Sequence, residues 1–470
     1  MRFEVLVRAE GDVVSAMDRR AFLKNAAAAA AAVPFHALLA RAEGLSQAGV
    51  RGLSGIGYGP LVEALDVATG LPLLKLPEGF RYVTFGWAGD IMADGQSTPG
   101  KHDGMGAFAA GPGRVRLVRN HETDKGPPFS RVAYDPGACG GTTTIEFDTE
   151  AGRFVSAHAS LSGTMRNCAG GPTPWGSWLT GEETTDFVER AHGYVFEVPA
   201  DGFGNPTPIR DMGRFSHEAV AVDPATGYLY QTEDPGASVL SFFGGSSHKA
   251  GFYRFVPNVN GRLAAGGQLF MLKVRRARKA DLGKSYANGT TFDIEWVPIA
   301  KPDDPDGRAS DDFVWSQGRE QGAATFARLE GCWYGNGRVY LVATDGGIGQ
   351  GQVWEYDPAA ETISLLFESP GKDVLNKPDH LTVSPRGGIV LCEDGGGDEF
   401  LHGLTGTGEI FTFAQNNVTL RGERNGLAGD FRNAEWAGPC YSPDGQWLFA
   451  NIYSPGITVA ITGPWQAGAL

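Results

Sequence analysis

The sequence is poor in cysteine, and its cysteines are not spaced for zinc or for paired redox chemistry. Its 470 residues contain five, and no CxxC pair or Cys/His zinc-finger spacing occurs among them. Structural zinc sites and dithiol redox motifs are therefore excluded. Cys332, Cys392 and Cys440 lie in strand-like runs, where a free cysteine usually packs as a small apolar group.

Positive charge is also scarce. Forty Lys and Arg face 54 Asp and Glu, which gives a formal net charge of −14. A nucleic-acid partner is not expected, because phosphate backbones need a basic footprint. The sequence has no Gly-x-Ser-x-Gly elbow, and the glycine-rich run at 346–351 is not followed by a helix pattern. That run is therefore interpreted as a loop and not as a nucleotide cradle.

Long apolar runs are absent after the N-terminal region, because no apolar stretch in the rest of the sequence reaches 18 residues. No membrane span is therefore expected in the mature protein. Near the start, Arg19 and Arg20 precede Phe-Leu-Lys and a run of seven alanines at 26–32. This pattern resembles a twin-arginine signal, which exports proteins already folded. The alternative is an amphipathic helix of the mature protein.

The domain prediction follows from that signal. Residues 1–42 are predicted to be the signal segment and residues 43–79 an N-terminal extension. Residues 1–16 are a candidate start-site artefact, because Met17 directly precedes Asp18 and the twin arginine. The expected partner is the twin-arginine export machinery, and the expected location is the periplasm or the outside of the cell. Residues 1–42 carry six cations and four acids, so removing this +2 segment changes the net charge from −14 to −16.

What the sequence does have is a repeat, seen in six segments that align on a turn residue. The turn residues are Pro112, Pro174, Pro224, Asn336, Pro385 and Pro443. Six residues before the turn stand Gly106, Cys168, Glu218, Glu330, Asp379 and Ala437. Polar residues follow the turn by eight to ten positions, at 120–122, 182–183, 233–234, 345, 393–394 and 451. A two-stranded hairpin places both sets at the same end of a sheet.

The repeat predicts an all-β fold, specifically a six-bladed β-propeller over residues 80–465. Each segment continues into a β-branched or aromatic run, and 68 Gly and 28 Pro supply the turns. Four of the five turn spacings fit one four-stranded blade. The long spacing holds a predicted surface insertion at 258–325, in the connection to the fourth blade. The strand-like run 80–85 is expected to close the ring by completing the last blade. The alternative is a double-sheet sandwich.

A ring of acids and one thiol around a common axis would repel itself, so metal binding is the natural hypothesis. The predicted ring residues are Cys168, Glu218, Glu330 and Asp379. A thiolate among oxygen ligands selects a transition metal, for which iron is a good candidate. The acid clusters after the turns, with Glu122, Glu183, Glu393 and Asp394, suit calcium. The alternatives are a buried structural thiol for Cys168 and solvated loop charges for the acids.

Three cations stand two residues before the ring positions: Arg166, Arg328 and Lys377. Residues i and i+2 of a strand share a face, so the cations are expected to flank the acidic ring. A cationic rim beside bound metals suits a ligand with several anionic oxygens, phosphate above all. The alternative is that each cation simply pairs with its neighbouring acid.

These segments resemble the signature of PhoX-type alkaline phosphatases, in the same order over about residues 75–465. The matching segments are NHE at 120–122, RNCAGGPTPWGSWLTGEE at 166–183, SHEA at 216–219, RLEG at 328–331 and CEDG at 392–395. The resemblance implies a six-bladed propeller with an iron pair and calcium ions near its channel. It implies iron ligands at Cys168, Glu218 and Glu330, and calcium ligands at Glu122, Glu183 and Asp394. It also implies that Arg328 clamps the substrate phosphate.

The function predicted from the sequence is hydrolysis of phosphate monoesters by an exported enzyme with iron and calcium. Its substrates are expected to be small-molecule phosphate esters. Two alternatives stay open at this point. One is a calcium-dependent lactonase or organophosphate hydrolase, and the other is a non-catalytic propeller whose loops bind calcium.

Overall fold

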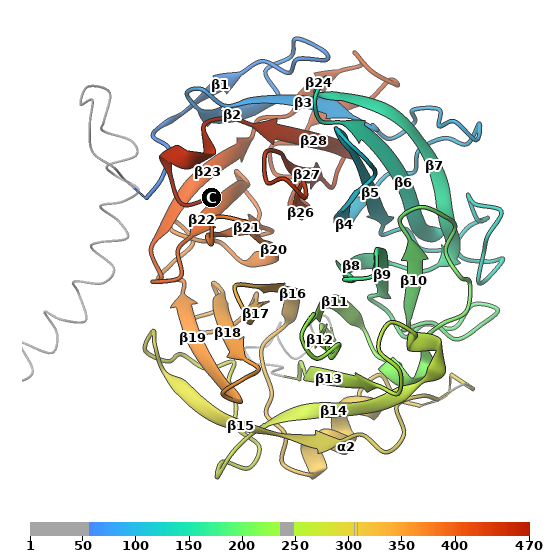
Figure 1. Cartoon of the computed structure of the whole chain (residues 1–470), viewed down its shortest axis with the longest axis vertical. Coiled ribbons are helices and arrows are strands. Elements are labelled where there is room, and N and C mark those ends of the chain that lie inside the picture. Colours follow the sequence, from blue (N-terminus) through green and yellow to red (C-terminus); the bar gives the residue numbers. More distant parts are fainter. Residues whose placement is uncertain (1–55, 236–248, 305, 308) are drawn as a thin grey trace, which may run out of the picture.

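The protein, described by a computed structural model at residues 56–235, 249–304, 306–307 and 309–470, is an all-β, propeller-like ring (Figure 1). The predicted signal segment 1–42 and residues 43–55 of the predicted extension lie outside these described residues. The described part of the chain contains no helix whose length and hydrophobicity would suit a membrane crossing.

The strands form antiparallel sheets arranged around a common axis. Two sheets have four strands each: β4 (His102–Ala109), β5 (Arg114–His121), β6 (Gly140–Asp148) and β7 (Arg153–Thr164); and β26 (Trp436–Tyr441), β27 (Leu448–Ile452), β28 (Ile457–Thr462) and β3 (Arg81–Phe85). A three-stranded sheet holds β8 (Asn167–Pro172), β9 (Ser177–Glu182) and β10 (Val195–Pro199). The short ribbon β24 (Thr419–Arg421) and β25 (Ala428–Asp430) stands apart from these.

Two larger sheets complete the ring. One runs in the order β1 (Leu61–Ala64), β2 (Leu74–Pro77), β23 (Ile410–Asn416), β22 (Phe400–Leu404), β21 (Ile389–Glu393) and β20 (Pro378–Val383). The other runs β11 (His217–Val222), β12 (Leu229–Glu233), β13 (Phe252–Pro257), β14 (Gly267–Val274), β15 (Thr291–Pro298), β19 (Thr362–Glu368), β18 (Gln352–Asp357), β17 (Arg338–Ala343) and β16 (Leu329–Gly335).

The strands that line the axis contact one another in a closed series. Around the ring β4 contacts β8, β8 contacts β11, β11 contacts β16, β16 contacts β20, β20 contacts β26, and β26 returns to β4 (Figure 1). The ring is closed by β3, which pairs with β28 from Arg81–Thr462 to Phe85–Thr458. The predicted closure by residues 80–85 is therefore confirmed. Closure matters because it pairs a sheet edge that would otherwise be open.

The sheets pack face to face, so their middle strands are apolar on both sides. Strand β27 reads Leu-Phe-Ala-Asn-Ile and is buried at every residue, as is β28. Strands of this largely apolar kind are buried at every residue only where neighbouring sheets cover both faces. The sequence predicts that the β-branched or aromatic run of each segment forms the strand directly after its hairpin. In the fifth segment the run at 410–413 lies one strand further from the axis, in β23, because β22 intervenes.

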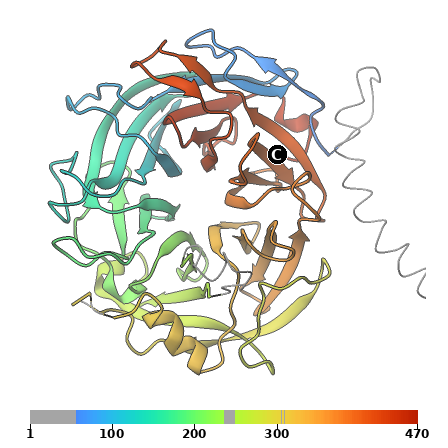
Figure 2. The same cartoon turned by 180° about the vertical axis from the view of Figure 1, so that it is seen from behind.

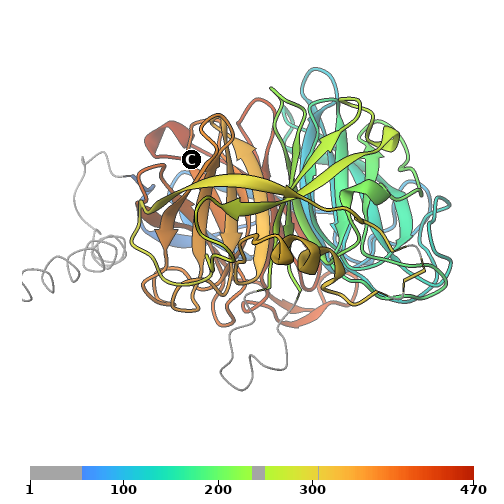
Figure 3. The ribbon, with the colours of Figure 1, turned by 90° about the horizontal axis from the view of Figure 1, so that it is seen from below.

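Residues 258–325 are not the surface excursion that the sequence predicted. Strand β14 extends the sheet of β13, and β15 pairs both with β14 and with β19, which joins two neighbouring sheets. Figure 3 shows this yellow segment crossing the outside of the ring, and Figure 2 shows the helix α2 (Phe313–Glu320) that accompanies it. Several of its apolar residues, among them Met271, Leu272 and Ile294, are fully buried. The polar residues between them concealed this pattern.

Short elements outside the predicted limits also belong to the ring. Strands β1 and β2 lie before residue 80 and add to the edge of β23. At the other end, the 3-10 helix η4 (Trp465–Ala467) packs Trp465 and Leu470 into the core beside Tyr58. Further 3-10 turns within the described residues are η1 (Arg210–Met212) and η3 (Leu263–Ala265).

Candidate metal centre

Every strand that lines the axis has a β-bulge at the same level. In each, the ladder gains one extra residue relative to its partner strand. The residue pairs within the bulges are Asp103-Gly104, Cys168-Ala169, Glu218-Ala219, Glu330-Gly331, Asp379-His380 and Gly438-Pro439. A bulge bends its strand and re-aims a side chain. Here it positions an acid or the thiol in five of these six strands.

The bulges correct two of the ring positions predicted from the sequence. The first copy contributes Asp103, not Gly106, which sits in the regular ladder opposite Val118. The last copy contributes Gly438, not Ala437. Asp103 lies nine residues before its turn and Gly438 five before, against six in the other copies. The hairpins differ in length, so a fixed count from the turn fails at both ends.

The ring side chains form four overlapping groups that have the donors and spacing to hold metal ions. The groups are Asp103-Cys168-His380, Cys168-Glu183-Glu218, Glu218-Asp379-His380 and Glu218-Asp234-Glu330, each with its ligand atoms within 4.8 Å of one another. Glu218 belongs to three of them. It therefore connects the thiol side, around Cys168, to the all-carboxylate side, around Glu330. Of the residues that the resemblance implies as iron ligands, Cys168 and Glu330 thus lie in neighbouring groups that share the third, Glu218.

The chemistry of Glu218 indicates that a cation belongs there. The side chain is fully buried, and neither carboxylate oxygen has a hydrogen-bond partner among the described residues. An uncompensated buried carboxylate is costly, so native proteins pair it or place it on a metal. Burial, with the nearby Glu330 and Glu183, raises its pKa well above the ordinary value. Burial and the surrounding acids likewise raise the pKa of Cys168, Glu330 and Asp379.

These shifts predict how the stability of the metal-free protein changes with pH. Burial raises the pKa of Glu183 to about 8, against the lowering effect of Arg166. A carboxyl with a raised folded-state pKa stabilises the fold below its unfolded pKa, and this stability is lost as pH rises through the folded value. We expect the free energy of unfolding of the chelator-treated protein to fall between pH 5 and pH 9. Urea unfolding at each pH measures it, and a constant or rising value would contradict the expectation.

The three predicted cations stand beside the ring at partly exposed positions. Arg328 Nη2 contacts Glu330 Oε1 at 2.6 Å and Asp234 Oδ2 at 2.8 Å. Arg166 reaches Glu183 at 2.5 Å and Glu122 at 3.1 Å. Lys377 donates to Asp345 at 2.8 Å. The alternative interpretation paired each cation with its neighbouring acid. Of the three, only Arg328 makes this contact, to Glu330.

The three cations do not reach the ring through the simple alternation of strand faces that the sequence analysis assumed. Arg166, Arg328 and Lys377 have φ near +50°, in the left-handed region, just before their strands begin. Lys101 takes the same conformation before β4 and lies 3.9 Å from Glu122. A left-handed non-glycine residue costs about 1–3 kcal/mol and is concentrated at functional sites. Lys101 is thus a fourth rim cation that the sequence analysis missed.

Some predicted metal ligands lie outside the four groups among the described residues. Glu393 accepts the backbone N–H of Asn376 at 2.7 Å and lies 2.9 Å from His402 Nε2. Glu122 is held by Arg166 and by the hydroxyl of Tyr453. Asp394 lies next to the half-buried acid Glu435, and burial raises the pKa of Asp394. Calcium binding by these three residues stays a prediction.

Comparison with known proteins identifies the family. The model of the family "Alkaline phosphatase PhoX" matches residues 56–456, which is most of the chain. The chain belongs to the PhoX alkaline phosphatase family. Membership makes it a hydrolase, a phosphatase. The match supports neither of the two alternatives that the sequence left open, the lactonase and the non-catalytic propeller. None of the curated proteins matches the sequence.

Solved structures agree with the fold. PhoX from Pseudomonas fluorescens, determined with vanadate, a transition-state analogue, is 16% identical and has a TM-score of 0.62, covering 88% of this chain and 99% of that chain. XC5397, a gluconolactonase from Xanthomonas campestris, is 13% identical over 88% of this chain and 99% of its own. Its TM-score is 0.44, which is too low to carry an argument.

In this PhoX family member, neighbouring bulges are tied together by side chains. Asn120 on β5 donates to the carbonyls of Cys168 and Ala169 at 2.9 and 2.8 Å, and accepts from Trp178 Nε1 at 2.9 Å. In other copies Asn451 donates to the Asp103 carbonyl, Thr232 to that of Glu330 and Thr344 to that of Pro378. Each of these hydrogen bonds connects one hairpin to the first strand of the next hairpin around the axis, at or beside its bulge. The metal centre is therefore positioned by contacts between neighbouring hairpins.

We expect Asn120→Leu to loosen the Cys168 bulge. The change leaves two buried carbonyls and the Trp178 N–H without their partner, and each unsatisfied buried group costs about 1–3 kcal/mol. The free energy of unfolding from urea titration is expected to fall by several kcal/mol. Asn205→Ala, at an exposed turn, serves as a control expected to stay within about 0.5 kcal/mol. Equal stability of both variants would contradict this role of Asn120.

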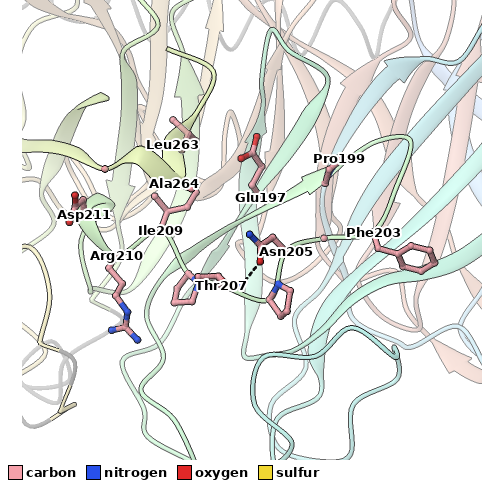
Figure 4. A pocket seen from close by; sticks show the side chains of 14 residues that line it. Glu197, Pro199, Phe203, Asn205, Thr207, Ile209, Arg210, Asp211, Leu263 and Ala264 are labelled. Atoms are coloured by element: carbon pink, nitrogen blue, oxygen red, sulfur yellow. Dashed lines mark hydrogen bonds between the residues drawn. The ribbon is translucent and has the colours of Figure 1, made fainter. Parts of the chain in front are cut away.

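The PhoX family chain also has a hollow of about 600 Å³ on its outer side, beside β10 (Figure 4). The polar groups that line it are occupied by the protein. Glu197 accepts from Trp175 at 2.7 Å and from Ser177 at 2.6 Å, Asp211 accepts from the backbone of Gly267, and Arg210 pairs with Asp303 at 2.9 Å. The convergent acids and the thiol lie at the axis. The hollow is therefore not the candidate site.

Proposed function

We propose that the protein is an exported phosphatase that hydrolyses small-molecule phosphate monoesters with an iron and calcium centre on the axis of a six-bladed propeller. The observation that carries this proposal is the convergence of Cys168, Glu218 and Glu330, with Glu218 shared between neighbouring groups of ligands. Family membership supplies the reaction class, and the buried unpartnered carboxylate of Glu218 supplies the need for cations.

The donor set fits two metal ions of the proposed kind. Cys168, Glu183 and Glu218 combine one sulfur with carboxylate oxygens, which favours a transition metal such as iron. Glu218, Asp234 and Glu330 offer oxygens alone. A carboxylate common to both groups is suited to join two cations, and the acids at the rim, Glu122 and Asp394 included, are proposed to hold calcium.

When bound, the metals would supply Lewis-acid stabilisation of the phosphoryl oxygens. The protein's own contribution begins with Arg328. Asp234 and Glu330 fix its guanidinium through Nε and Nη2. Among the described residues these contacts do not use Nη1, which can donate to a substrate oxygen. Because the group is held before substrate arrives, little of its binding energy is lost to ordering. We propose that Arg166 and Lys377 add positive charge at the rim, where an anionic ester would enter.

Export is proposed from the twin-arginine pattern and from the folded metal centre, which would be assembled before export. The proposed destination is the periplasm or the outside of the cell, with the twin-arginine machinery as partner. The acidic composition argues against nucleic acid as a substrate or partner.

The proposed function is tested by turnover of p-nitrophenyl phosphate, measured with the purified protein before and after chelation and after return of iron, of calcium, or of both. We expect activity to disappear with the chelator and to return fully only with both metals, with iron near two per chain by elemental analysis. Full activity with calcium alone, or turnover of a lactone in place of the phosphate ester, would overturn the proposal.

A further inference from the structure

His380 is an unusual residue for its place in the ring. It is the second residue of the β20 bulge, where four other copies have Gly104, Ala169, Ala219 and Gly331. These positions are small because neighbouring bulges approach closely; a Cβ added at Gly331 would lie 2.7 Å from the Asp379 carbonyl. A buried imidazole at such a crowded position needs a role beyond filling space.

One side of the His380 ring is fixed by the backbone. The N–H of Gly438, in the neighbouring bulge, donates to His380 Nδ1 at 2.9 Å. A backbone N–H can only donate, so Nδ1 is an acceptor and carries no proton. In a neutral imidazole the proton then sits on Nε2, because the hydrogen bond at one ring nitrogen sets the state of the other.

The other side of the ring faces the candidate centre. His380 Nε2 lies 3.6 Å from Cys168 Sγ, within hydrogen-bond range for sulfur. It lies 3.5 Å from Asp103 Oδ1 and 3.8 Å from Asp379 Oδ2, and both distances are long for an N–H···O hydrogen bond. All three neighbours are acceptors when ionised. An Nε2 that carries a proton can donate to the sulfur, and it has no lone pair for a metal.

We propose that His380 is a positioning residue that donates an N–H···S hydrogen bond to the Cys168 thiolate and does not itself bind metal. This inference rests on the proposed function in taking Cys168 as a metal ligand. The hydrogen bond would hold the sulfur in one orientation and withdraw charge from it, which tunes the bound ion. The series Gly438 N–H to His380 to Cys168 would also connect three sheets, those of β26, β20 and β8, across the centre of the ring.

The first test locates the proton directly and does not depend on iron. The full protein, labelled with ¹⁵N-histidine, is examined by long-range ¹H–¹⁵N NMR without metal and with Zn²⁺, and the His380 signals are assigned from their absence in His380→Gln. We expect the Nε2–H tautomer in both states. A zinc-loaded protein with the proton on Nδ1 and zinc on Nε2 would overturn the proposal.

The second test compares His380→Gln and His380→Leu in the iron-loaded protein. The Gln amide can place a donor near the position of Nε2, whereas Leu cannot. We expect Leu to keep iron in the centre, to shift the thiolate-to-iron absorption band to longer wavelength, and to weaken iron binding by about 10–100-fold. Gln is expected to restore the band. Loss of one iron per chain in both variants, or an unmoved band in Leu, would overturn the proposal.

His158→Leu controls for the loss of an imidazole, because His158 lies on the outermost strand β7, beside Phe203. It should leave the band and the iron content unchanged. A wild-type protein that takes up no iron would count against the proposed function, while the zinc experiment would still decide the role of His380.

Discussion

Replacing Glu218 with glutamine is expected to abolish most phosphatase activity while making the metal-free protein more stable. Glu218 is the one residue common to three of the four ligand groups, so its loss removes a donor from the centre of the site. Residues that merely support a metal ligand cost about 10–100-fold when changed. We expect the loss of a shared ligand to exceed this range in turnover of p-nitrophenyl phosphate.

The stability effect has the opposite sign because the carboxylate is unsatisfied without metal. The pKa of Glu218 is raised by burial and by the acids around it. Glutamine has the same shape and no charge, so the chelator-treated variant should gain about 1–3 kcal/mol at pH 8 in urea unfolding. Glu150→Gln, at an exposed turn, is the control and should change neither property. A variant that loses activity and also loses metal-free stability would show that Glu218 is an ordinary structural residue.

Arg328→Ala is expected to lower turnover by about 10²–10³-fold, the effect of removing one preorganised donor from a developing anion. The guanidinium is fixed by Asp234 and Glu330, and Glu330 together with Asp234 raises the pKa of Arg328. Its removal takes away a cation that competes with the metals for these two acids, so metal content should not fall. Turnover is measured under saturating iron and calcium, and metal content by elemental analysis.

Arg328→Lys separates phosphate binding from charge alone. Lysine keeps the charge but lacks the planar fork that holds two acceptors at once, so we expect it to recover only a small part of the lost activity. Arg338→Ala is a matched control, since Arg338 pairs with Glu355 and Asp357 on the outer part of its sheet. Turnover of Arg328→Ala within twofold of the wild type would mean that the arginine only neutralises its acids.

The register of acids and turns predicts much of this architecture, because strand hairpins convert sequence spacing into position. Cys168, Glu183, Glu218, Glu330 and Asp379 were all predicted, and the structure brings them together. The closure by residues 80–85 was predicted from the missing fourth strand, and β3 confirms it. These features depend on local patterns that repeat along the chain.

What could not be predicted depends on irregular backbone. Asp103 was displaced from the expected register by a longer hairpin, and His380 faces the site because of a bulge, which breaks the alternation of faces. Asp234 had been noted among the acids after the turns, but its place within 4.8 Å of Glu330 follows from how the hairpins β11–β12 and β16–β17 pack around the axis. Strand β15 joins two sheets through a segment whose exposed charges concealed its buried apolar side.

The central claim is that cations hold the thiol and the carboxylates at one centre. The most direct measurement is a crystal structure of the protein purified with iron and calcium, with anomalous scattering collected above and below the iron absorption edge. The account predicts iron peaks beside Cys168 Sγ and the carboxylates of Glu218 and Glu330, with Glu218 between the peaks. Full phosphatase activity in those crystals, with no iron peak in reach of Cys168 or Glu218, would contradict it.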